Sequence, residues 1–127
     1  MQLQLGELDQ KLGIELEEAS IERVVARMPV AGNRQPYGQL HGGASLAFGE
    51  FLGSWAASLH AAPLGKVAVG VEISATHHRA AREGQVTGVA TPLHLGQRLT
   101  THQIQITDNS GHLLSTIRVT NLLVDPN

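Results

Sequence analysis

The sequence predicts a single α+β domain over residues 1–127, in which one long helix lies on a six-stranded antiparallel sheet. One run, His41 to His60, has helical periodicity and contains no proline. Most of the remaining chain falls into segments with the alternation and β-branched content of strands. The later strands are joined by turns too short for crossover helices, so neighbouring strands are expected to run antiparallel. The length of 127 residues suits one domain.

The predicted central helix has the sequence HGGASLAFGEFLGSWAASLH. Its large apolar side chains recur at i, i+3, i+4 and i+7 and form one stripe for the sheet: Phe48, Phe51, Leu52, Trp55 and Leu59. Each interior glycine costs about 1 kcal/mol relative to alanine. We therefore expect a small-residue face with Gly43, Gly49 and Gly53 to be closely approached by a second subunit or a ligand. The alternative is an ordinary core helix with a flexible Gly-Gly start.

Glu50 is the single acid of this helix, and it points away from the apolar stripe. No lysine or arginine stands three or four residues away, so no ion pair within the helix is predicted for it. Its position favours a functional role over a structural one. The helix begins at His41-Gly42-Gly43, where unpaired backbone N–H groups and the positive end of the helix dipole can hold a carbonyl oxygen or an anion.

Two strands are predicted before the helix and four after it. Their ranges are Ile14–Ala19, Ile21–Val30, Val67–His77, Gln85–Ala90, Arg98–Thr107 and His112–Val124. A brief helix is expected within residues 3–12, a loop over 31–40 and a turn region over 92–96. The odd-numbered residues from Val67 to His77 are expected to share the apolar side of their strand, which places His77 on that side.

Composition argues against several classes of function. Lysine and arginine number 9 against 11 acids, and aromatic residues make up 3% of the chain, which argues against nucleic-acid binding. The absence of cysteine excludes a disulfide framework and a thiolate nucleophile, and it suits a cytoplasmic protein. No apolar run and no N-terminal pattern predicts a membrane span or a signal peptide, so we expect a soluble, unprocessed chain. The motifs of nucleotide cofactors are absent, and no cofactor is expected.

Seven histidines raise the question of a metal site. The closest pair is His77-His78, and neighbours on a strand point to opposite faces, so no metal site is predicted. Near the end of the same strand, His78, Arg79 and Arg82 gather positive charge. The arginines form a solvated turn unless the ligand carries phosphate groups.

Several segments of the sequence resemble a known family. The series RQPYG at 34–38, HGGAS at 41–45, Glu50 nine residues after His41 and Ser54 four residues later closely resembles hotdog-fold acyl-CoA thioesterases. The segments VGVEISATHHRAAREG and TPLHLGQR are also similar, and the resemblance covers residues 22–124. It implies a hotdog fold, with the sheet wrapped around the central helix. The similar branch acts on aromatic acyl-CoA and includes 1,4-dihydroxy-2-naphthoyl-CoA thioesterase of menaquinone synthesis and the glutamate-type 4-hydroxybenzoyl-CoA thioesterase.

The resemblance also implies roles for individual residues. Glu50 would attack the thioester carbonyl or activate a water that does, and the Gly42 N–H would hold the oxyanion. Gln35 and His41 would position the thioester, and Ser54 would orient the carboxylate or the water. Four residues would meet the substrate or its coenzyme A: Gly43, His77, Arg79 and Arg82. The choice between a covalent anhydride and general-base attack stays open.

Helix geometry adds a prediction about assembly. Gly42 and Glu50 are eight residues apart, about 12 Å along one helix, so both cannot touch one carbonyl group. We therefore expect Glu50 of one subunit to work with Gln35, His41 and Gly42 of its partner. The family's homodimer, often paired again into a homotetramer, agrees with this. The rival hypotheses are a non-catalytic hotdog module that binds an acyl or aromatic ligand, and a dehydratase, against which the spacing of HGG and Glu50 argues.

Overall fold

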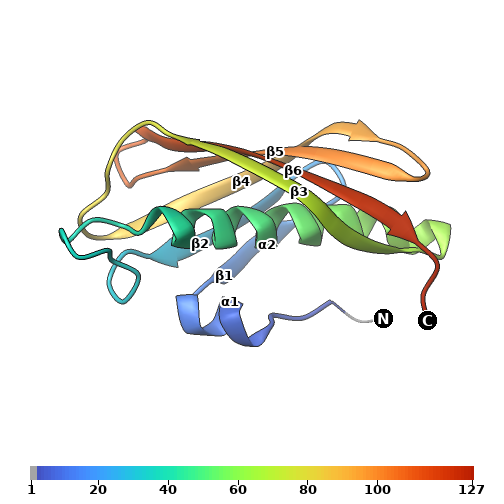
Figure 1. The fold of residues 1–127 in the computed structure, drawn as a ribbon, viewed down its shortest axis with the longest axis horizontal. Helices are drawn as coiled ribbons and strands as arrows, with labels where there is room; N and C mark the ends of the chain where they lie inside the picture. The colour runs from blue at the N-terminus through green and yellow to red at the C-terminus, as the bar shows by residue number, and fades with distance from the viewer. Residues whose placement is uncertain (1–2) are drawn as a thin grey trace.

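The computed structural model describes residues 3–127 and confirms an α+β fold built from one long helix and six strands (Figure 1). The elements in chain order are α1 (Glu7–Leu12), β1 (Glu15–Ala19), β2 (Val24–Pro29), α2 (Gly42–Ala61), the 3₁₀ helix η1 (Ala62–Leu64), β3 (Val67–His77), β4 (Gln85–Leu95), β5 (Leu99–Thr107) and β6 (Leu113–Val124). The brief first helix ends at Gly13, whose φ of 77° lies in the left-handed region that glycine adopts without strain. No helix among the described residues is both long and apolar enough to cross a membrane.

The six strands form one sheet in the order β1-β2-β4-β5-β6-β3, and every neighbouring pair is antiparallel. Helix α2 connects β2 to β3 and lies along one face of the sheet (Figure 1), where it packs against strands β2 to β6. This connection carries the chain across the sheet, so β3 joins β6 at the edge opposite β1. The sheet thus wraps around the helix and leaves β3 as an edge strand.

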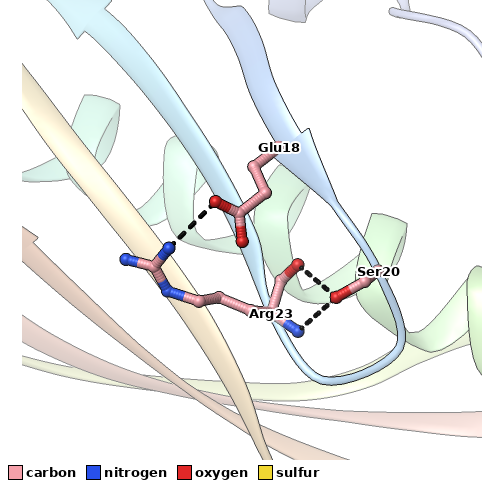
Figure 2. Close-up of polar contacts among 3 residues, drawn as sticks. All are labelled: Glu18, Ser20 and Arg23. Atoms are coloured by element: carbon pink, nitrogen blue, oxygen red, sulfur yellow. Dashed lines mark hydrogen bonds and ion pairs between the residues drawn. The ribbon is translucent and has the colours of Figure 1, made fainter.

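The hairpin expected near Ser20 is present, and a short polar network closes it (Figure 2). The Ser20 hydroxyl accepts the Arg23 N–H at 3.1 Å and lies 3.2 Å from the Arg23 carbonyl oxygen, to which it donates. The Arg23 guanidinium reaches back to Glu18 at 3.0 Å. These contacts take up residues 20–23 in the turn, which is why β2 begins at Val24, later than the sequence predicted.

The apolar stripe of α2 builds the core, as predicted. Phe48 and Leu52 are fully buried, Phe51 is nearly so, and Trp55 and Leu59 pack against the cluster from its margin. Their partners on the sheet are β-branched or flexible side chains that point inward: Met28, Val86, Ile104, Ile106, Ile117 and Val119. Burial of each large side chain contributes about 1.5–3 kcal/mol, so this stripe fixes the helix on the sheet.

The expectation for the small-residue face was wrong for two of its glycines. A Cβ on Gly49 would lie 2.7 Å from Ile117 Cδ1, and a Cβ on Gly53 would lie 2.8 Å from Val119 Cβ. Both glycines therefore let the helix approach β6 of its own chain. The spacing of large apolar residues predicts only one helix face in contact with the sheet. This sheet wraps around the helix and also covers the face that carries Gly49 and Gly53.

Strand β3 also departs from the predicted alternation. Its pairing with β6 shifts register between Gly70 and Glu72, which marks a β-bulge. Beyond the bulge, Ile73, Ala75 and His77 face the helix as predicted, and the first two pack against the core. Before the bulge the sides are exchanged, because Ala68 and Gly70 pair with the buried Leu123 and Asn121.

Strand β4 is longer than predicted, since it continues through Pro92 to Leu95. Proline lacks an N–H and is usually excluded from central strands. The pairing of β2 with β4 ends at Ala90, so the residues that follow are bonded only to β5. Pro92 therefore lies where one side of β4 is free, and the ladder bulges between Pro92 and His94.

Candidate active site

A pocket of about 350 Å³ opens at the N-terminal end of α2, between the loop of residues 34–40 and the end of β3. Four of the predicted site residues line it: Gln35, Gly42, His77 and Arg79. Its other lining residues are Gln39, Leu40, Ser45, His78, Ala80, Ala81, Leu114 and Ser115. Residues that are distant in the sequence therefore meet where the helix begins.

The loop before the helix is held in place by its own hydrogen bonds. The Asn33 amide group donates to the carbonyl oxygens of Leu12 and Pro29, both at 2.8 Å. The Gln35 N–H donates to Gln39 at 2.8 Å and closes a tight turn, in which the Gln35 side-chain oxygen also accepts the Tyr37 N–H. These bonds fix the backbone that carries Gln35 beside the helix start.

His41 caps α2. Its Nδ1 accepts the Gly43 N–H at 2.8 Å, which leaves the proton of a neutral ring on Nε2. This bond uses the Gly43 donor, whereas the Gly42 N–H has no acceptor among residues 3–127. Gly42 lines the pocket, so a free backbone donor and the positive end of a 20-residue helix coincide there.

His77 closes the pocket from β3. Its Nε2 lies 2.9 Å from the point that a Cβ on Gly42 would occupy, and its Nδ1 lies 2.8 Å from the Ser115 hydroxyl. Ser115 is directly opposite His77 in the ladder between β3 and β6 and is buried. The imidazole is thus held between a strand partner and the first residue of the helix.

The positive residues after β3 do not all reach the pocket. Arg79 and His78 line it, and the His78 ring is also bonded to Thr116 Oγ1 at 2.9 Å. Arg82 is exposed and is not among the lining residues, although its carbonyl oxygen accepts the Arg34 Nε–H at 3.0 Å. The structure therefore separates two arginines that the sequence grouped together.

Glu50 lies outside this pocket, near the middle of α2. Its side chain is exposed beside β3, with Oε1 3.3 Å from the position of a Cβ on Gly70. Ser54 is half-buried one helical turn later. His41 and Gly43 belong to the helix start but are exposed and do not line the cavity. One chain thus carries two separate groups of predicted site residues.

Sequence reasoning missed two hydroxyl groups of the pocket, Ser45 and Ser115. Ser45 is buried one turn after Gly42, and its place in the HGGAS segment was a usable signal. Ser115 offered no such signal, because β3 and β6 are far apart in the chain and their register cannot be read from either strand. Among residues 3–127, no group of three metal-ligating side chains comes together.

The arrangement can bind a polarised carbonyl or an anion at the helix start, while the acid that could attack lies along the same helix. The family model described as the thioesterase superfamily matches residues 37–115, which include the helix start, Glu50 and His77. The chain therefore belongs to the thioesterase superfamily, has the hotdog fold and is a thioester hydrolase. The family match favours hydrolysis over the rival hypothesis of a non-catalytic ligand-binding module.

Three relatives narrow the comparison. The proofreading thioesterase EntH of Cronobacter turicensis is 44% identical over 94% of this chain and 88% of its own. The 1,4-dihydroxy-2-naphthoyl-CoA hydrolase of Escherichia coli K12 is 45% identical over 89% of this chain and 83% of its own. A solved structure of the thioesterase SAV0944 of Staphylococcus aureus is 30% identical, with a TM-score of 0.84 over 95% of this chain and all of its own.

Proposed function

We propose that the protein hydrolyses an aromatic acyl-CoA to the free acid and coenzyme A. Glu50 of one subunit attacks the thioester carbonyl carbon or activates the water that does. The carbonyl oxygen accepts the Gly42 N–H of the partner, and Gln35 and His41 of that partner position the thioester. The observation that carries this proposal is a free backbone donor at the start of the helix whose single acid faces away from the core.

The spacing of two residues in SAV0944 supports the pairing of Gln35 with Glu50. Its solved mutants replace a glutamine and a glutamate that stand fifteen positions apart. Gln35 and Glu50 are separated by the same number of positions. Gln35 lines the pocket at the helix start and Glu50 lies beyond it, so we assign both to one reaction but to different subunits of the dimer.

The free edge of β3 supports this assembly. The strand has 11 residues, no partner on its outer side among the described strands, and two exposed valines, Val69 at 46% and Val71 at 52%. Such an edge favours pairing with another strand. Val71 is the extra residue of the bulge in β3. Antiparallel pairing with a second copy, about a twofold axis at Ser74, therefore places Gly70 opposite the partner's His77.

This register also completes the site, because Glu50 lies beside Gly70 and Gly42 lies beside His77 within each chain. The acid of one subunit then meets the oxyanion donor of the other, twice in each dimer. A dimer of dimers remains our expectation for the full assembly. Pairing of the β3 edges uses the exposed side of the strand and leaves the outer sheet face for such a second contact.

In the proposed reaction, the negative charge that develops on the carbonyl oxygen is held by the Gly42 N–H and the helix dipole. Collapse of the tetrahedral intermediate breaks the carbon–sulfur bond, and coenzyme A leaves as a thiolate. A thiolate is a good leaving group and needs little acid assistance. If Glu50 forms an anhydride, a water hydrolyses it. Ser54, one turn after Glu50, orients the carboxylate or this water.

The positive end of the pocket suits the phosphates of coenzyme A. Arg79 lines the cavity beside His77, and a guanidinium binds phosphate oxygens in a bidentate manner. We assign Arg79 and His77 to the coenzyme A moiety, with Arg82 as an outer contact and Gly43 at the helix start. The acyl group then extends towards Glu50 of the other subunit.

The acyl group we propose is aromatic, of the 1,4-dihydroxy-2-naphthoyl or hydroxybenzoyl type. Support comes from the 45% identical hydrolase whose name states the naphthoyl substrate. The relative named as a proofreading enzyme is 44% identical, so identity alone does not choose between the two roles. If the substrate is 1,4-dihydroxy-2-naphthoyl-CoA, the protein acts in menaquinone synthesis.

A hydrolysis screen tests the function. Release of free thiol is measured for 1,4-dihydroxy-2-naphthoyl-CoA, 4-hydroxybenzoyl-CoA and a saturated acyl-CoA of similar size, with the wild type and with Glu50→Gln. We expect the aromatic esters to be hydrolysed fastest, and we expect Glu50→Gln to lose most of the activity while it stays folded. Removal of the attacking group should cost several kcal/mol of transition-state stabilisation. Activity within about tenfold of the wild type would contradict the role of Glu50.

A further inference from the structure

Three polar side chains are buried beneath the C-terminal half of α2 without any hydrogen-bond partner. Thr100, His102 and Asn121 are each fully inaccessible to solvent. Within residues 3–127, the Thr100 hydroxyl, both His102 ring nitrogens and both ends of the Asn121 amide have no hydrogen-bond partner. Buried polar groups are nearly always bonded, because an unmet donor or acceptor destabilises the fold. Side chains kept in this state call for a functional explanation.

Asn121 lies next to the proposed catalytic acid. It is directly opposite Gly70 in the ladder of β3 with β6 and directly opposite Thr100 in the ladder of β5 with β6. The position of a Cβ on Gly70 would be 3.3 Å from Glu50 Oε1 and 3.8 Å from Asn121 Nδ2. The carboxylate and the amide therefore border the same small space, which exists because residue 70 has no side chain.

The backbone conformation at position 70 does not require glycine. Six glycines of the chain have a positive φ, and Gly70 is not one of them. Glycine weakens a strand interior, and it often marks a site where another group approaches closely. Here the approaching group is the Glu50 carboxylate, for which a side chain at position 70 would leave little room.

On these grounds, and on the function proposed above, we propose that Asn121 is a positioning residue for Glu50. Its amide N–H donates to the Glu50 carboxylate across the space beside Gly70, directly or through one water. A carboxylate only accepts hydrogen bonds, so it faces the nitrogen of the amide. The bond holds the carboxylate towards the thioester.

The test uses Asn121→Leu, which keeps the size of the side chain and removes its polar atoms. Protein with ¹³C-labelled glutamate carboxyl groups is observed by NMR, and the Glu50 signal is assigned by its absence in Glu50→Gln. We expect the Glu50 signal to move in Asn121→Leu. With 4-hydroxybenzoyl-CoA, we expect kcat to fall on the order of tenfold to a hundredfold, as for a lost hydrogen bond to a charged group, with little change in KM.

Stability separates this role from a structural one. Asn121→Leu replaces buried polar atoms by apolar ones, and the exposed Glu50 carboxylate can bond to water instead. Its melting temperature should therefore equal or exceed that of the wild type. Gly70→Ala fills the same space from β3 and should lower kcat in the same way. The matched control is Thr120→Val, next to Asn121 on the opposite face of β6, which should change neither the Glu50 signal nor kcat.

An unmoved Glu50 signal in Asn121→Leu would overturn the inference, and so would an unchanged kcat. The inference would also be overturned if Asn121→Leu, Gly70→Ala and Thr120→Val all lost kcat together with melting temperature, because the loss would then reflect general destabilisation. If Glu50→Gln keeps its activity, the proposed function fails. The NMR comparison of Asn121→Leu with Thr120→Val still decides whether Asn121 contacts the carboxylate.

Discussion

His77 Nε2 lies 2.9 Å from the point that a Cβ on Gly42 would occupy. The end of β3 and the start of α2 are thus packed so closely that any side chain at position 42 would displace the His77 ring. Because of this contact, the free N–H of Gly42 lies in the same pocket as His77 and Arg79.

The first prediction concerns this contact. Gly42→Ala should reduce thioesterase activity by at least about tenfold, because the methyl group displaces the His77 ring and narrows the oxyanion site. Its melting temperature should change little, since the displaced atoms are the end of a side chain and alanine favours the helix. Activity close to that of the wild type would contradict an oxyanion role for this end of the helix.

A glycine further along the same helix should behave in the opposite way. A Cβ on Gly53 would lie 2.8 Å from Val119 Cβ and 3.0 Å from its Cγ2, so Gly53→Ala forces the helix away from β6. We expect it to lower the free energy of unfolding by about 1–3 kcal/mol, as other overpacked cores do. Denaturant unfolding measures this change. An unchanged or increased stability would show that the helix and β6 can separate at no cost.

The third prediction distinguishes two arginines. Arg79→Ala should raise KM for an acyl-CoA and leave a short pantetheine thioester nearly unaffected, because Arg79 lines the pocket where we place the phosphates. Arg82→Ala is the matched variant outside the lining and should have a smaller effect. Equal effects on both thioesters, in either variant, would return that arginine to the role of a solvated surface residue.

The central helix, its apolar stripe and all six strands could be predicted from the sequence, because these features depend on local periodicity. The predicted alternation puts His77 on the correct side of β3, but this alternation holds only for the residues after the bulge. The bulge between Gly70 and Glu72 depends on pairing with β6, and a single strand does not reveal it. The continuation of β4 through Pro92 likewise depends on where β2 ends.

The candidate site was predictable to a similar extent. Gln35 and Gly42 stand in one segment, and their spacing predicted that both lie at the helix start, where they line the pocket. The order of the strands, by contrast, brings Ser115 into the pocket lining and Asn121 to the space beside Glu50. Arg82 stands three residues after Arg79, and only the path of the chain shows that it leaves the pocket lining. Spacing along the chain thus predicted which residues gather near the helix start, whereas the positions of Ser115 and Asn121 depend on strand pairing.

The fourth prediction is a dependence of stability on pH. Burial, together with the nearby charge of His60, lowers the pKa of His102 from 6.5 to about 4. The unfolded chain therefore binds one more proton than the folded chain between these values, and His102 reduces stability as the pH falls from about 6.5 to about 4. The loss should reach about 3 kcal/mol at the acid end.

This dependence can be isolated by comparison with His102→Met, which removes the titrating group and keeps an apolar side chain of similar volume. The free energy of unfolding is measured for both proteins from pH 7 to pH 4. The wild type should lose more stability than the variant over this range. Two parallel curves would contradict the burial of a neutral His102.

The central claim is that two chains complete each active site, and a mixing experiment tests it most directly. We expect Glu50→Ala and Gln35→Ala each to be inactive alone. A mixed dimer of the two contains one site with both defects and one with neither. Random co-refolding of equal amounts gives half mixed dimers, so about a quarter of wild-type activity should return. Each variant refolded alone is the control. If mass spectrometry shows mixed dimers and activity stays at the level of the parents, the site lies within one chain and the claim is wrong.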